Sequence, residues 1–102
     1  MSQYVELDAL NALSPGQPKP YRAGAWDIVV VRVGDDLYAL ENRCSHDDEG
    51  LVGGELEDGA IVCPRHGAKF CLKTGDALCP PAYEPIRRFE VRCQDGRFGV
   101  LI

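Results

Sequence analysis

Histidine is scarce in this chain: there are only two among 102 residues. Long hydrophobic runs are also missing. The longest aliphatic run, at residues 28–31, is far shorter than the roughly 20 residues that a membrane-spanning helix requires. The N-terminal residues lack a basic segment followed by an apolar one, which is the pattern of a secretory leader. We therefore expect a protein without a membrane anchor or an export signal.

Basic side chains are in deficit. There are 11 Lys and Arg residues against 16 Asp and Glu residues, a formal net charge of −5. Binding to nucleic acid requires clustered positive charge that neutralises phosphates, so the sequence argues against a nucleic-acid partner. An acidic surface instead favours rapid encounter with the basic face of a protein partner.

The length and the cysteine count set two further limits. A chain of 102 residues is of the size of one domain, so we expect a single domain over residues 1–102. Five cysteines cannot all pair within one chain. A complete disulfide framework is therefore excluded, and a reducing cytoplasm is the expected location.

The pattern of apolar residues predicts an all-β protein. A short helical segment at residues 8–13, capped by Asp8, is the one helix we expect. Elsewhere short β-branched and aromatic runs alternate with turn residues. In the strand over residues 89–93, alternation places Cys93 on the buried face. The predicted strands cover residues 25–33, 37–40, 55–56, 61–62, 89–93 and 98–102, with hairpin turns at Asp58-Gly59 and Asp95-Gly96.

Two short pairs of metal-binding side chains stand out, Cys44-Ser45-His46 and Cys63-Pro64-Arg65-His66, separated by sixteen residues. Each pair offers one thiolate and one imidazole and follows a predicted strand. Two sulfur and two nitrogen donors suit either a tetrahedral zinc ion or an iron–sulfur cluster whose two irons have different ligands.

The order of the donors favours the cluster. A typical zinc finger groups its cysteines together and carries its histidines on a helix, and no helix is expected at either pair. When two adjacent loops each give one ligand to each iron of a 2Fe–2S cluster, every loop must hold one Cys and one His. The mixed pairs fit that requirement, while a zinc module remains an alternative.

The chain resembles the Rieske family on these residues. Cys-x-His and Cys-x-x-His at this separation match the family signature, and the resemblance extends through residues 66–70, Gly75 and Pro80-Pro81. It implies the Rieske fold: an antiparallel β sandwich or partly open barrel with a small cluster-binding subdomain, about residues 43–83. It also implies one Rieske-type 2Fe–2S cluster per chain. In this scheme Cys44 and Cys63 hold the inner iron, and His46 and His66 hold the outer iron.

Several positions depart from the membrane-bound branch of the family. That branch carries a disulfide between its two ligand loops, and Glu49 and Arg65 stand at the matching positions here. It also places hydroxyl donors near the cluster sulfurs, where this chain has Ala68 and Phe70. Fewer donors stabilise the reduced cluster less, so a low potential is expected.

These departures, the small size and the absence of an anchor resemble the soluble Rieske ferredoxins. The resemblance implies a cytoplasmic and monomeric electron carrier without catalytic residues. It would move one electron from a flavin-dependent reductase to a non-haem iron oxygenase. The small subunit of a reductase such as nitrite reductase is the alternative, although such subunits tend to lack the cluster ligands. We expect Cys71, Cys79 and Cys93 to have structural roles, since free cysteine usually behaves as a small core residue.

The first prediction concerns the redox potential. Rieske centres span about −150 to +300 mV, and the missing hydroxyl donors place this one at the low end of that range. A redox titration of the purified protein measures the midpoint. A value above roughly +100 mV would contradict the argument from Ala68 and Phe70.

Overall fold

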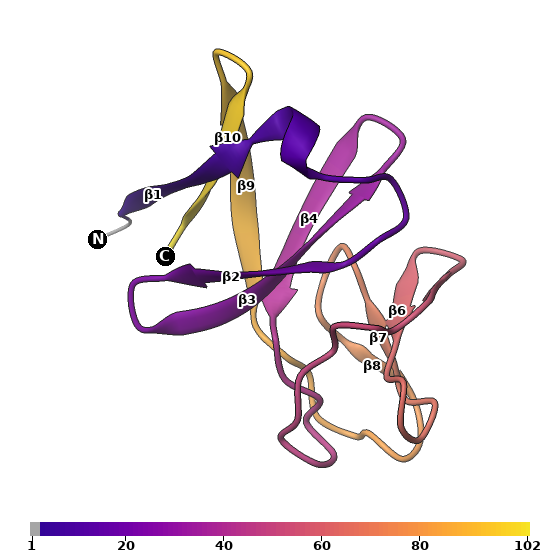
Figure 1. The fold of residues 1–102 in the computed structure, drawn as a ribbon. Coiled ribbons are helices and arrows are strands. Elements are labelled where there is room, and N and C mark those ends of the chain that lie inside the picture. The colour runs from indigo at the N-terminus through magenta and orange to yellow at the C-terminus, as the bar shows by residue number, and fades with distance from the viewer. Residues whose placement is uncertain (1–2) are drawn as a thin grey trace.

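The computed structural model describes residues 3–102, and β-strands account for most of its regular structure (Figure 1). A larger sheet has six antiparallel strands in the order β1-β10-β9-β4-β3-β2. Its strands are β1 (Tyr4–Ala9), β2 (Lys19–Ala23), β3 (Trp26–Val33), β4 (Asp36–Glu41), β9 (Arg88–Gln94) and β10 (Arg97–Leu101).

The larger sheet curls until its two edges meet. Edge strands β1 and β2 do not pair, yet the Tyr21 hydroxyl on β2 donates a hydrogen bond of 3.1 Å to Asp8 Oδ2 on β1. Lys19 Nζ lies 3.7 Å from the same carboxylate oxygen. Burial and the bond to Asp8 raise the pKa of Tyr21 to about 12, so the phenol remains a donor at neutral pH. The sheet is therefore a nearly closed barrel, and the predicted all-β fold class is confirmed.

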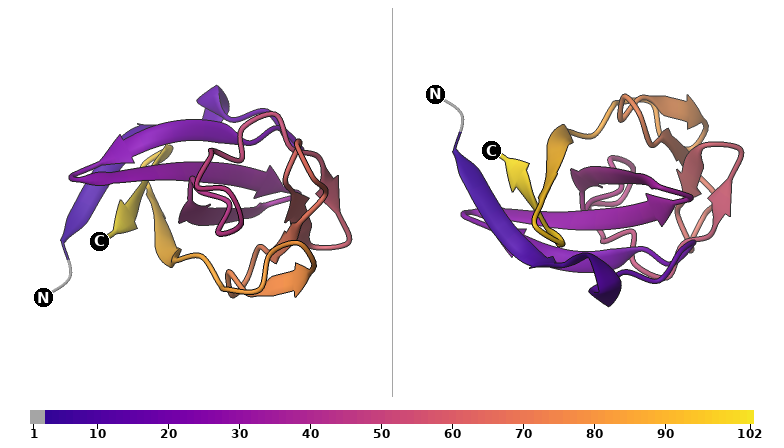
Figure 2. Two further views of the ribbon diagram at one scale, coloured as in Figure 1. Left: turned by 90° about the horizontal axis from the view of Figure 1, so that it is seen from below. Right: turned by 90° about the horizontal axis from the view of Figure 1, so that it is seen from above.

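A smaller antiparallel sheet is inserted between β4 and β9 in the sequence. Its order is β5-β6-β7-β8, and it lies at the end of the molecule opposite the two termini (Figure 2). It falls within residues 43–83, the range in which a cluster-binding subdomain is expected. The strands are β5 (Leu56–Glu57), β6 (Ala60–Val62), β7 (Lys69–Cys71) and β8 (Ala77–Cys79).

Strand β3 separates two apolar cores. Ile28 and Val30 face the core inside the larger sheet, while Val29 and Val31 face the core shared with the smaller sheet. All four side chains have no exposed surface. A strand that is buried on both faces must be apolar at consecutive positions, which explains the unbroken run at residues 28–31. Cys44 and Cys63 belong to the core on the side of the smaller sheet.

Both predicted hairpin turns are confirmed. Asp58 and Gly59 have φ values of 47° and 78°, and Asp95 and Gly96 have φ values of 53° and 75°. Left-handed backbone at both central positions is the signature of the tight turn that matches the twist of paired strands. The first of these turns joins β5 to β6, and the second joins β9 to β10.

Two predictions about local structure are wrong. Residues 4–9 form strand β1, and only Leu10–Ala12 form a short 3-10 helix, without a side-chain cap. Asp8 is held in the sheet instead, because it accepts bonds from Tyr21 and from the Ala9 backbone. Cys93 is exposed rather than buried, because it lies near the end of the β9–β10 hairpin.

Gly75 lies in the turn between β7 and β8, and its backbone contacts the segment that leads from β8 back to the barrel. Its N–H donates to Cys71 O at 2.7 Å, and its carbonyl accepts from Ile86 N at 2.9 Å. The residue has φ of 82°, and a Cβ atom added there would overlap the carbonyl oxygen of Ile86. Only glycine satisfies both the backbone angle and the close approach.

The second prediction compares Gly75→Ala with Gly16→Ala. Gly16 has φ of 81° but nothing near the position of an added Cβ, so it matches Gly75 in backbone strain alone. Left-handed backbone costs alanine about 1–2 kcal/mol, and overpacking adds about 1–3 kcal/mol at Gly75. Denaturant unfolding of both variants measures the difference. Equal loss of stability would show that the contact with Ile86 relaxes freely.

Candidate metal centre

The two Cys-His pairs lie in two loops with the same backbone hydrogen bonds. In the first loop Cys44 N–H donates to Glu49 O at 2.7 Å, and Asp48 N–H donates to Cys44 O at 2.8 Å. In the second loop Cys63 N–H donates to Ala68 O at 2.7 Å, and Gly67 N–H donates to Cys63 O at 3.1 Å. Each cysteine therefore begins a turn, and the residues four and five positions later close it through these bonds.

Both turns need left-handed backbone at the same place. Asp48 has φ of 61° and Gly67 has φ of 77°, and each is the fourth residue after its cysteine. Glycine adopts this conformation freely, and aspartate is among the side chains that tolerate it best. The loops are thus equivalent in backbone, although the histidine stands two residues after Cys44 and three residues after Cys63.

The structure brings all four predicted donors together at one end of the molecule. The Cys44 and Cys63 side chains are 0% and 1% exposed, whereas His46 and His66 are both exposed. The two imidazole rings have centroids 5.1 Å apart and meet edge to face. Sulfur donors consequently lie on the inner side of the loops and nitrogen donors on the outer side.

The thiols are suited to exchange a proton for a metal ion. Burial is the main cause that raises the pKa of Cys44, with a smaller contribution from the adjacent Cys63 thiol. The backbone N–H groups of His46 and Asp47 act in the opposite direction. Cysteine binds metals as the thiolate, so a bound cation would supply the positive charge that this dry site lacks. Two inner sulfurs and two outer nitrogens fit the unequal donor set of a Rieske centre.

An ion pair that the sequence did not predict joins the two loops. Arg65 Nε and Nη2 donate to Asp47 Oδ2 and Oδ1 at 2.7 and 3.1 Å, and Arg65 Nη1 donates to Gly50 O at 2.8 Å. The Arg65 bonds, followed by the Glu49 N–H, hold the pKa of Asp47 well below its ordinary value. Although Asp47 follows an exposed histidine, its own side chain is only 18% exposed. Nothing in the residue spacing identified this partner.

A third segment completes the rim of the site. Ser45 Oγ donates to Glu84 O at 2.6 Å, which ties the first loop to the segment that follows Pro80 and Pro81. Pro81 and Tyr83 line a hollow together with His46, and Tyr83 is 81% exposed. The peptide bond between the two prolines is cis. The proline segment therefore lies beside the histidine end of the loops, as the resemblance implied.

Two further cysteines end strands β7 and β8 of the smaller sheet, outside the four-donor set. Cys79 Sγ donates to Gly67 O at 3.6 Å and so contacts the second loop. A hydrogen bond with Thr74 is the main cause that lowers the pKa of Cys71. Both side chains are partly buried, and their structural role stays a prediction.

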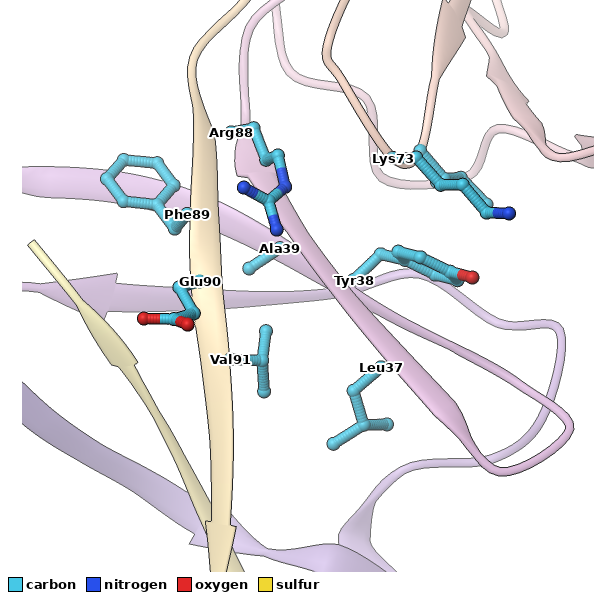
Figure 3. Close-up of a pocket in the computed structure, with 9 residues that line it drawn as sticks. Leu37, Tyr38, Ala39, Lys73, Arg88, Phe89, Glu90 and Val91 are labelled. Carbon is cyan, nitrogen blue, oxygen red and sulfur yellow. The ribbon is translucent and has the colours of Figure 1, made fainter.

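A separate cavity lies between the barrel and the smaller sheet. Strands β4 and β9 form most of its wall, and Lys73 reaches it from the β7–β8 turn (Figure 3). Its other polar side chains include Arg88 and Glu90, and none of its lining residues is a cysteine or a histidine. The donors of the candidate centre are therefore elsewhere.

Comparison with known proteins agrees with this site. The family model of the Rieske [2Fe-2S] domain matches residues 3–90, and the chain therefore belongs to the Rieske family. A ferredoxin subunit of anthranilate 1,2-dioxygenase from Burkholderia cepacia is 34% identical over 102 residues, which is 100% of this chain and 94% of that subunit. The predicted family and the predicted Rieske-type cofactor are confirmed.

Solved structures agree with the sequence relatives. The ferredoxin of carbazole 1,9a-dioxygenase from Nocardioides aromaticivorans has a TM-score of 0.92 at 31% identity and covers 96% of both chains. The ferredoxin in a complex of reduced oxygenase and oxidized ferredoxin of carbazole 1,9a-dioxygenase has a TM-score of 0.86 at 35% identity, with 95% of this chain and 91% of that chain covered. The protein is an electron carrier of the ferredoxin type rather than a catalytic subunit.

The alternatives are less well supported. A nitrite reductase small subunit from Mycobacterium tuberculosis has a TM-score of 0.90 and covers 100% of this chain and 96% of its own, but at 18% identity it shows only that the fold is shared. The family match favours an iron–sulfur cluster over a zinc module. Within residues 3–102, we find no helix of the length and apolarity needed to cross a membrane.

Proposed function

We propose that this protein carries single electrons from a flavin-dependent reductase to a non-haem iron oxygenase. In this proposal Cys44 and Cys63 hold the inner iron of a Rieske 2Fe–2S cluster, and His46 and His66 hold the outer iron. The cluster supplies a one-electron redox couple when it is bound. One observation carries the assignment: two buried thiols lie beneath two exposed imidazoles on adjoining loops of equivalent backbone.

The side chains around the site suit transfer to a protein surface. His46 and His66 are exposed, so a partner can approach the nitrogen side without any loop having to open. Tyr83 and Pro81 lie next to His46 and offer apolar contact area. Aromatic side chains are enriched in protein interfaces, whereas the thiols beneath are kept from water and from oxidants. We infer that the partner docks on the face made by His46, His66, Pro81 and Tyr83.

The remaining parts of the proposal follow from the same features. Residues 1–102 would act as a single, monomeric domain in the cytoplasm, with residues 43–83 as its cluster-binding subdomain. The formal charge of −5 suits encounter with basic faces on both partners.

The third prediction concerns the cofactor itself. Purified protein should contain about two irons and two acid-labile sulfides per chain and be red-brown. After reduction with dithionite, electron paramagnetic resonance should give the low average g value of a centre with unequal iron ligands. One zinc ion per chain without visible absorbance would overturn the electron-carrier assignment.

The fourth prediction concerns His66. His66→Cys should keep the iron but lower the midpoint potential, because a thiolate donates more negative charge to the outer iron than an imidazole does. Ser14→Cys is the matched control, since it adds an exposed thiol on a loop outside the site. Redox titration of both variants decides the question. An unchanged midpoint in His66→Cys would show that His66 is not a ligand.

A further inference from the structure

A fifth potential metal donor lies among the four proposed ligands. One ligand atom each from Cys44, His46 and Asp47 fall within 4.8 Å of one another. The Asp47 Oδ2 atom also lies 3.7 Å from His66 Nδ1. Asp47 is therefore close to both histidines, and its side chain is only 18% exposed. A thiol, an imidazole and a carboxylate are thus close enough to share one metal ion, and the second imidazole lies beside the carboxylate.

Three hydrogen bonds hold the Asp47 carboxylate, two at Oδ1 and one at Oδ2. Arg65 donates to both of its oxygens, and Glu49 N–H donates to Oδ1 at 3.1 Å. A planar guanidinium that bonds both oxygens also fixes the plane of the carboxylate. Arg65 is itself held in place by its bond to Gly50 O, so it cannot turn away without losing three contacts.

We propose that Arg65 is a specificity-determining residue that keeps the Asp47 carboxylate out of the metal centre. With Arg65 in place, the available donors are two thiolates and two imidazoles, the set that the family match assigns to a 2Fe–2S cluster. Without it, Asp47 joins Cys44 and His46, the donors that lie within 4.8 Å of it, in a competing site for a single divalent ion. This inference rests on the proposed function, in which Cys44, His46, Cys63 and His66 are the ligands. It adds a role for Arg65, which lies between Cys63 and His66 in the sequence but does not itself bind metal.

The ordinary role for Arg65 is that of a loop cross-link, and the two roles differ in what Asp47 does after the cross-link is lost. A cross-link fails in the same way whichever partner is removed. If Arg65 restrains a competing ligand, the loss of Arg65 creates a new metal site, and the additional loss of the carboxylate abolishes that site again. The double variant therefore separates the two roles.

The fifth prediction uses Arg65→Met, Arg65→Lys, Asp47→Asn and the double variant Arg65→Met with Asp47→Asn. Each apoprotein is titrated anaerobically with ferrous ion alone, and separately reconstituted with ferrous ion and sulfide. Arg65→Met should bind one ferrous ion at least about tenfold more tightly than the wild type, within the range seen when groups around metal ligands are changed. On reconstitution it should contain less sulfide per iron.

The control variants fix the interpretation. The double variant and Asp47→Asn should bind ferrous ion alone with the affinity of the wild type. The affinity of Arg65→Lys should lie between those of the wild type and Arg65→Met, because lysine keeps the charge but not the bidentate contact. Circular dichroism of each apoprotein checks that the fold is kept. Equal ferrous affinity in Arg65→Met and the double variant, or in Arg65→Met and the wild type, would overturn the role of Arg65.

Failure of this inference can be told from failure of the proposed function. Wild-type protein that takes up no sulfide under reconstitution refutes the 2Fe–2S assignment, whatever the variants do. The ferrous titration requires no cluster and compares four variants that differ only at Asp47 and Arg65. If Arg65→Met unfolds, Arg65→Lys against wild type decides the same question through its expected intermediate affinity.

Discussion

The whole site depends on one constraint: two thiols must lie in the apolar interior while imidazoles two or three residues away remain in water. A short turn that starts at each cysteine meets this requirement. Each turn closes where the cysteine N–H bonds the carbonyl of Glu49 or of Ala68, so the residues in between point toward the surface. Hydrogen bonds to the backbone of Cys44 and Cys63 hold both turns.

The barrel supplies the dry floor for these turns. Val29 and Val31 on β3 and Leu40 on β4 pack in the same core as the two thiols, together with Phe70 from the smaller sheet. Because β3 is buried on both faces, changes in the interior of the barrel act directly on the floor of the site. Gly75 then sets the distance at which the chain after the smaller sheet returns to the barrel.

The sequence was sufficient to predict the fold class and the hairpins, and it singled out the four proposed donors, because each inference depends on a local rule. Asp-Gly turns require left-handed backbone, and paired Cys and His residues at short spacing are rare without a metal. The errors concern contacts between distant segments. Asp8 forms a bond to Tyr21 across the barrel edges, and Cys93 is exposed although its cross-strand partner Phe98 is buried. Strand alternation alone cannot show where burial ends along a strand.

The link between Arg65 and Asp47 was missed for the same reason, because the two residues are 18 positions apart in the chain. Arg65 stands at a position that holds a cysteine in the disulfide-bearing branch of the family, as the sequence resemblance implies. A disulfide depends on the redox potential around it, whereas hydrogen bonds to a carboxylate do not. An ion pair between the loops is therefore insensitive to the redox conditions around the protein.

The use of an aspartate in this cross-link has two consequences for the neighbouring ligands. A carboxylate beside two imidazoles is itself a metal ligand, and on its own it would add negative charge where an electron must be accepted. The Arg65 guanidinium counters both effects. It donates a hydrogen bond to each oxygen of Asp47, and its positive charge offsets the negative charge of the carboxylate. The three bonds made by Arg65 thus join the loops, neutralise the acidic residue next to His46 and leave the proposed ligands as the free donors at this end of the fold.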